Sequence, residues 1–154
     1  MKTEPPLGIT ELSDCEMKYI LAIFELGGDS RPIKISDLSK HLNLALPTVS
    51  IMVRKLAKRG LVCIVKRGYI TLTNNGCNLA CMLIHAHGIL EHIFVKAGLS
   101  PNEACCIASK IQNKVPYTVI MELWEKMGKP SECPHGIPMV KKEGRVCPCN
   151  FCKD

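Results

Sequence analysis

The stretch ISDLSKHLNLALPTVSIMVRKLAKRGLVCIVKRGYITLT, residues 35–73, decides the fold of this chain. Apolar side chains recur at helical spacing in residues 36–42, and a short turn separates them from a second helical pattern in residues 47–59. Two short apolar runs follow, residues 61–65 and 69–73, on either side of a basic turn that ends in glycine. The pattern predicts two helices followed by a β-hairpin.

Helix, short turn, helix and hairpin form the plan of a winged helix-turn-helix. The second helix of this motif fits the major groove of DNA, where base edges carry a distinct donor and acceptor code. Basic residues at the wing tip and along the helix suit phosphate contacts. The DNA-contacting candidates are Pro47, Thr48, Ser50, Ile51, Arg54, Lys55, Lys66 and Arg67, with Lys58 and Arg59 as further phosphate contacts. The alternative is a small winged module that binds another protein.

Outward from this module, the remaining chain is also helical. Ser36 is the expected N-cap of the first helix of the pair, and residues 29–33 are expected to form a loop. Helical patterns are predicted before it, from about residue 12 to residue 26, and after it, over residues 77–97, 100–115 and 116–128. The fold class is therefore mainly α. It comprises a winged helix-turn-helix domain (1–76), a helical domain (77–130) and a Cys-rich tail (131–154).

Composition limits the class of protein. The 154 residues are 47% hydrophobic and 22% charged, with a formal net charge of +6 that suits an anionic partner. Neither a signal peptide nor an apolar run of membrane-spanning length is recognised, which predicts a cytoplasmic protein without a membrane partner. No arrangement of general base, phosphate loop or nucleophile indicates an enzyme.

The tail holds Cys133, Cys147, Cys149 and Cys152, with His135 beside the first. Thiolates this close converge only if their charge is neutralised, and a soft metal does so. Four cysteines suit tetrahedral zinc and an iron–sulfur cluster equally. A thiol–disulfide switch and a tail with incidental cysteines are the alternatives. The cysteines interpreted as buried apolar residues are Cys15, Cys63, Cys77, Cys81 and Cys106.

Over residues 13–140 the chain resembles the diphtheria-toxin-repressor family of metal-dependent regulators, which includes manganese-responsive repressors. The resemblance rests on the order and spacing of several short motifs. They are Glu16-Met17-Lys18-Tyr19-Ile20, Ile35-Ser36-Asp37-Leu38 to Leu42, Pro47-Thr48-Val49-Ser50, Leu56-Ala57-Lys58-Arg59-Gly60-Leu61, Leu72-Thr73-Asn74-Asn75-Gly76, His87-Gly88-Ile89-Leu90-Glu91 and Cys133-Pro134-His135-Gly136-Ile137-Pro138. The resemblance implies a homodimer formed through residues 78–128, a palindromic DNA operator, and repression switched by a divalent metal.

The chain departs from the family pattern at the primary metal site. The aligned positions are Lys18, Ser109, Gln112 and Asn113, and an ammonium group or neutral amides are poor ligands for transition metals. The usual iron or manganese switch is therefore predicted to be lost.

A second family site, His-x-x-x-Glu plus a later His, is partly kept as His87 and Glu91, with Cys105 near the later position. This leaves a possible divalent metal site, with a buried His–Glu pair as the alternative. An iron–sulfur cluster in the tail would give the regulator a new sensor in place of the lost metal site. We therefore favour a cluster over zinc in the tail.

The leading hypothesis is a transcriptional regulator, expected to be a repressor, whose DNA affinity depends on a metal or cluster held by the C-terminal cysteines. His135, His87, Glu91 and Cys105 are further candidate ligands. The alternatives are a winged-helix protein-interaction module with structural zinc and a thiol redox-switch regulator.

Overall fold

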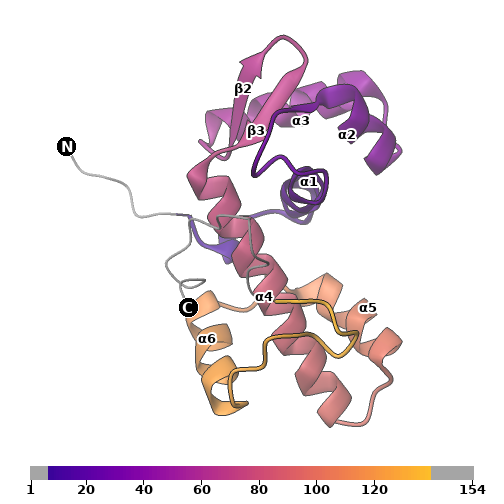
Figure 1. Cartoon of the computed structure of the whole chain (residues 1–154), viewed down its shortest axis with the longest axis vertical. Helices are drawn as coiled ribbons and strands as arrows, with labels where there is room; N and C mark the ends of the chain where they lie inside the picture. The colour runs from indigo at the N-terminus through magenta and orange to yellow at the C-terminus, as the bar shows by residue number, and fades with distance from the viewer. Residues whose placement is uncertain (1–6, 140–154) are drawn as a thin grey trace, which may run out of the picture. The chain divides into compact units, whose positions relative to one another are not determined.

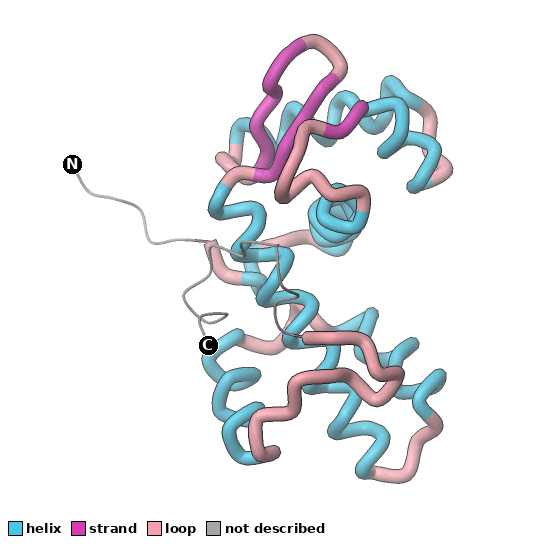
Figure 2. Tube along the Cα trace, viewed as in Figure 1, coloured by secondary structure: helices cyan, strands magenta, loops and turns pink. Residues whose placement is uncertain are grey.

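The computed structural model describes residues 7–139, which form two compact units (Figure 1). We call residues 14–80 the wing unit, and residues 7–13 with 81–139 the helical unit. The mainly helical fold with one small sheet, drawn by secondary structure in Figure 2, confirms the predicted fold class. The domain boundaries at residues 76 and 130 stay predictions.

The wing unit contains the predicted helix pair and hairpin, preceded by one further helix. Its sheet is antiparallel throughout, in the strand order β1-β3-β2. The elements are α1 (Asp14–Glu25), β1 (Ile33–Lys34), α2 (Ile35–Leu42), α3 (Leu46–Lys58), β2 (Val62–Lys66) and β3 (Tyr69–Leu72).

Two predictions at the start of α2 were wrong. The loop expected over residues 29–33 is present at residues 29–32, but Ile33 pairs with Ile70 as part of β1, a strand too short to give an alternating pattern. Ser36 is not the N-cap, because α2 already begins at Ile35 and has no side-chain cap. The Ile35 amide instead donates to the carbonyl of Gly68, 2.9 Å away, so the wing turn satisfies the first amide of the helix.

The end of α2 and the turn of the hairpin follow the sequence. Asn43 caps α2 in the left-handed region, with φ of 53°, a conformation that asparagine tolerates better than most residues. The hairpin pairs Val62 with Leu72 and has an irregular register between Ile64 and Lys66. Gly68 has a φ of 81°, which the tight basic turn requires.

A buried ion pair supports the core of the wing unit. Glu16 on α1 is 3% exposed and pairs with Arg59, the C-cap residue of α3. A carboxylate buried at this depth is tolerated only when it is paired and hydrogen-bonded. The surrounding core is aliphatic and includes Ile20, Ile23, Leu38, Val49, Val53, Leu56 and Ile70.

The helical unit is built on the second part of α4 (Asn74–Lys96), together with η1 (Ile9–Glu11), α5 (Pro101–Ile111) and α6 (Tyr117–Lys126). A capping box begins α5: the Glu103 amide donates to Oγ of Ser100, 3.2 Å away, and Ser100 N donates back to the Glu103 carboxylate. α4 begins three residues before the predicted start at residue 77.

By length and composition, α4 is long and apolar enough to cross a membrane, with a mean hydropathy of 1.3 over its best window. The expectation that no segment has this character is therefore corrected. Half of that window is buried inside the protein, as in the core helix of a soluble domain. Glu91 and His85 lie on the same helix and are buried, so α4 also carries polar groups that need protein partners.

Replacing Arg59 with alanine is expected to destabilise the protein by about 3–5 kcal/mol, because the buried Glu16 carboxylate loses its cation. Urea unfolding followed by circular dichroism measures this loss. The matched control is Lys58→Ala, since Lys58 is exposed on the same helix end and should change stability little. Equal stability of the two variants would contradict the structural role of the pair.

Candidate functional site

A buried carboxylate lies at the centre of the candidate site. Glu91 on α4 is 0% exposed, and both of its oxygens are enclosed. Oε2 lies 3.3 Å from Nε2 of His87, and Oε1 lies 2.5 Å from Nδ1 of His135. Although these distances are short, neither oxygen accepts a hydrogen bond of good geometry from the described residues. The carboxylate therefore lacks the compensation that a buried charge requires.

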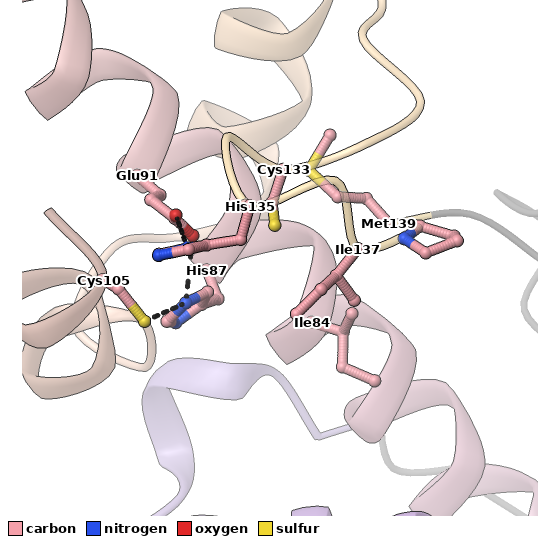
Figure 3. Close-up of a pocket in the computed structure, with 10 residues that line it drawn as sticks. Ile84, His87, Glu91, Cys105, Cys133, His135, Ile137 and Met139 are labelled. Atoms are coloured by element: carbon pink, nitrogen blue, oxygen red, sulfur yellow. Dashed lines mark hydrogen bonds and ion pairs between the residues drawn. The ribbon is translucent and has the colours of Figure 1, made fainter. Parts of the chain in front are cut away.

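The side-chain amide of Gln112 orients the ring of His87. Its Nδ1 lies 2.8 Å from Oε1 of Gln112, and because that oxygen can only accept, Nδ1 carries the proton. The other ring nitrogen, Nε2, faces Glu91 and lies 3.5 Å from the sulfur of Cys105 (Figure 3). A second hydrogen bond that fixes the tautomer in this way is typical of metal-ligating histidines.

Cys105 on α5 adds a thiol to this group. Its donor atom and those of His87 and Glu91 all lie within 4.8 Å of one another. Burial raises the pKa of the Cys105 thiol, and the nearby Glu91 carboxylate and Cys133 raise it further. The thiolate form therefore needs an added positive charge.

Nitrogen, sulfur and carboxylate oxygen in one buried cluster suit a divalent transition metal, and zinc is bound by all three ligand types. The positions aligned with the family's primary metal site do not form such a group. Lys18 is exposed, Ser109 Oγ donates to the carbonyl of Cys105 at 2.8 Å, and Asn113 Nδ2 donates to the carbonyl of Leu12 at 3.1 Å. These contacts support the predicted loss of the primary site.

Of the tail residues predicted to act together, the structure describes Cys133 and His135. Cys133 and His135 lie beside Glu91, in a small pocket that His87 and Cys105 also line (Figure 3). The sequence treated these as two separate groups. The remaining tail cysteines, Cys147, Cys149 and Cys152, lie outside the described residues.

Sequence reasoning missed two amides that contact these histidines: Gln112 beside His87, and Asn102, whose Oδ1 lies 3.1 Å from Nε2 of His135. Gln112 was noticed only as a missing ligand. No sequence signal links either amide to its histidine, because each contact joins separate elements.

The prediction of buried apolar cysteines was correct for Cys77 and wrong for Cys15, Cys63 and Cys106, which are exposed, while Cys81 is half-buried. These residues lie on amphipathic elements where helical or strand spacing did not reveal which face is covered.

His85 lies two residues before His87 and takes no part in the donor cluster. Its ring lies edge-on to Tyr117 and Trp124, with centroid separations of 5.9 and 5.2 Å. Burial lowers the pKa of His85 to about 4, so the ring is neutral near pH 7. His85 is thus a core residue packed between aromatic rings.

A second candidate surface lies on the wing unit. On α3 the buried residues Val49, Val53 and Leu56 alternate at helical spacing with exposed ones. The exposed predicted contacts are Pro47, Thr48, Ile51, Arg54, Lys55, Lys66 and Arg67, whereas Ser50 is half-buried. Ile51 is 63% exposed, which is unusual for a large apolar side chain and suits contact with a thymine methyl group.

Arg59 was predicted as a phosphate contact, but its guanidinium pairs with the buried Glu16. Lys66 at the wing tip lies over the ring of Tyr69, with Nζ 4.6 Å from the centroid, and remains exposed. The exposed basic residues among the predicted contacts are therefore Arg54, Lys55, Lys58, Lys66 and Arg67.

Comparison with known proteins matches two family models to successive parts of the chain. Residues 11–69 match the family model described as iron dependent repressor, N-terminal DNA binding domain. Residues 73–141 match the model described as iron dependent repressor, metal binding and dimerisation domain. Both descriptions are of repressors and not of enzymes.

Individual proteins give similar results. A solved hypothetical protein of Sulfolobus solfataricus is 33% identical with a TM-score of 0.72, over 83% of this chain and 98% of that one. An uncharacterised HTH-type transcriptional regulator of Aeropyrum pernix is 29% identical over 80% of this chain and 70% of its own length. The transcriptional regulator MntR of Escherichia coli O157:H7 is 30% identical over 61% of this chain, which spans 59% of that protein.

The hydrogen bond from His87 to Gln112 predicts that the neutral His87 ring carries its proton on Nδ1 in the metal-free protein. Nitrogen-15 chemical shifts of the imidazole ring measure this directly. Replacing Gln112 with leucine should remove the preference, and Gln112→Glu should restore it because a carboxylate also accepts. A proton on Nε2 in the unmodified protein would contradict the arrangement.

Proposed function

The chain belongs to the iron-dependent repressor family, and we propose that it is a DNA-binding transcriptional repressor controlled by a divalent metal ion at Glu91. It would act in the cytoplasm as a homodimer on a palindromic operator. The wing unit would contact DNA, and the helical unit would hold the metal and the dimer contact.

The observation that carries this proposal is the buried Glu91 carboxylate, which has no hydrogen bond from the described residues and lies 3.3 Å from Nε2 of His87. His87, Glu91 and Cys105 would hold the ion. A bound cation would neutralise the carboxylate and stabilise the Cys105 thiolate. Gln112 keeps the ligating nitrogen of His87 directed at the site.

DNA recognition would combine base and phosphate contacts. Thr48, Ser50 and Ile51 lie in the first turns of α3, where a helix in the major groove reaches base edges. Arg54 and Lys55 on α3, with Lys66 and Arg67 on the wing, would contact the phosphate backbone. The exposure of these four basic residues supports their assignment as phosphate contacts.

Metal control would act through the helices that carry the site. Glu91 and His87 belong to α4 and Cys105 belongs to α5, so an ion shared by them restrains the packing of one helix on the other. In a homodimer on a palindrome, the two recognition helices must enter successive major grooves about 34–36 Å apart. A small change in helix packing can therefore favour or prevent binding.

An iron–sulfur cluster finds no support, because the matched family models describe metal binding and Cys133 lies beside Glu91 and His135. The predicted participation of Cys147, Cys149 and Cys152 in metal binding stays a prediction. A role for these cysteines in a thiol switch is likewise untested.

Replacing Lys55 and Arg67 with alanine, singly, should weaken operator binding and lower the salt slope by about one in each variant, because each removes one phosphate contact. Fluorescence anisotropy over a range of salt concentrations measures both quantities. The charge-matched control is Lys126→Ala on α6, where Lys126 lies 3.6 Å from Glu122 on the surface. An unchanged salt slope in both test variants would contradict the assigned interface.

Zinc or manganese should raise operator affinity by about 5–150-fold over the chelator-treated protein, the usual range of allosteric coupling. Glu91→Gln should lose this response, because it removes the charge that retains the ion. Glu122→Gln, an exposed carboxylate on α6, is the matched control and should keep it. If the unmodified protein binds its operator equally with metal and with chelator, the proposed metal control is wrong. If it binds no DNA in either condition, the proposed repressor function is wrong.

A further inference from the structure

The start of helix α3 exposes large apolar side chains to solvent. Leu44 in the preceding turn, Leu46 and Ile51 are 43%, 47% and 63% exposed. The core of the wing unit does not need them, because Val49 and Val53 belong to the buried face of the helix. Exposed apolar side chains that gather in one place mark a surface that meets a partner.

Ile51 shares one face of α3 with two further exposed residues. Pro47 and Thr48 precede it by four and three positions, the spacing of neighbours on a helix surface. Thr48 adds a methyl group and a hydroxyl group to this face. We call Pro47, Thr48 and Ile51 the reading patch, in which Ile51 has the largest apolar side chain.

The turns that carry the reading patch lack the side chains that specify purines. Residues 46–53 contain no charged and no amide side chain. Arginine or lysine reads guanine through O6 and N7, and asparagine or glutamine reads adenine through N6 and N7. The first such side chain on α3 is Arg54. The polar side chains before it are Thr48 and the half-buried Ser50, whose hydroxyl groups discriminate little between bases.

Charge identifies the partner of the reading patch. No acidic residue occurs in Leu46–Lys58, and Arg54, Lys55 and Lys58 are exposed on the turns that follow the patch. Positive charge of one sign beside an apolar patch suits a polyanion that also displays apolar groups. Duplex DNA meets both conditions, because its phosphates border a major groove that carries the C5-methyl groups of thymine.

We propose that Ile51 makes the 5-methyl group of a pyrimidine the specificity-determining feature of the operator. This inference rests on the proposed function, which places α3 in the major groove, and it adds which chemical group is read there. The reading patch covers the methyl group at one fixed position of each half-site. Because Ile51 has neither a donor nor an acceptor, it contacts the methyl group alone, and 5-methylcytosine can replace thymine at that position.

Affinity and specificity then belong to different residues of α3. Arg54 and Lys55 contact phosphates, which gives a salt-dependent affinity that is the same for all sequences. Ile51 carries no charge, so its contact discriminates between sequences without changing the number of counterions released. Substitutions of the two kinds therefore change different measured quantities.

The test begins with selection from a duplex library of randomised sequence, using the full-length chain with zinc present. The selected duplex is then synthesised with thymine, uracil, cytosine or 5-methylcytosine at each selected thymine position in turn, opposite the complementary purine. Uracil differs from thymine only by the methyl group, and cytosine differs from 5-methylcytosine by the same group. Fluorescence anisotropy measures the affinity for each duplex over a range of salt concentrations.

At one position of each half-site, uracil should bind about fourfold more weakly than thymine, the fold-change that corresponds to one buried methyl group. Cytosine should bind more weakly than 5-methylcytosine by a similar factor. Ile51→Ala should abolish both differences and leave the salt slope unchanged, because no charge is removed. Lys55→Ala should keep both differences and lower the salt slope.

Ile64→Ala is the matched control, because Ile64 is an isoleucine on β2 that is 46% exposed and lies outside α3. This variant should keep the preference for methylated pyrimidines. Circular dichroism of each variant verifies that it is folded.

Uracil that binds as tightly as thymine at every selected position would overturn the inference and leave the proposed repressor standing. A methyl preference that persists in Ile51→Ala, or 5-methylcytosine that binds no better than cytosine, would also overturn it. Selected duplexes without a fixed thymine would do the same. Failure to bind any duplex would overturn both this inference and the proposed DNA-binding function.

Discussion

The buried carboxylate of Glu91 is the constraint on which the helical unit depends. Taking such a charge out of water costs several kcal/mol unless it is paired with good geometry. The described neighbours leave both oxygens without hydrogen bonds, although a ring nitrogen of His87 and one of His135 lie close to them. Residues of α5 and of the turn at residues 131–139 lie beside this group, so the packing of both segments on α4 depends on what neutralises the carboxylate.

Neutral side-chain amides contact the two histidines beside Glu91. One of these amides, Gln112, is also a position at which the sequence departs from the family pattern. Gln112 occupies a position where the resembling family has a metal ligand, and an amide there is a poor ligand. In the structure its oxygen accepts from His87 and thereby frees the opposite nitrogen. Asn102 does the same for His135. Gln112 and Asn102, which are poor metal ligands, thus orient histidines that can bind a metal.

Ionic interactions serve different purposes in the two units. In the wing unit, Arg59 is taken up by the buried Glu16, which removes it from the basic surface and leaves that surface to exposed lysines and arginines. In the helical unit, no described lysine or arginine forms an ion pair with Glu91, so imidazoles and thiols surround the charge. The first arrangement stabilises a core without a ligand, while the second leaves room for a cation.

The sequence by itself determined the features that depend on neighbours within a few positions. Examples are the helix and hairpin order of residues 35–73 and the helical segments before and after it, because spacing and turn chemistry act locally. Only the tertiary structure decided that β1 forms and that the Gly68 carbonyl accepts the first amide of α2. It also decided that Cys133 and His135 lie beside Glu91. Those outcomes rest on contacts between segments far apart in the chain, whose burial and charge compensation exist only once the segments pack together.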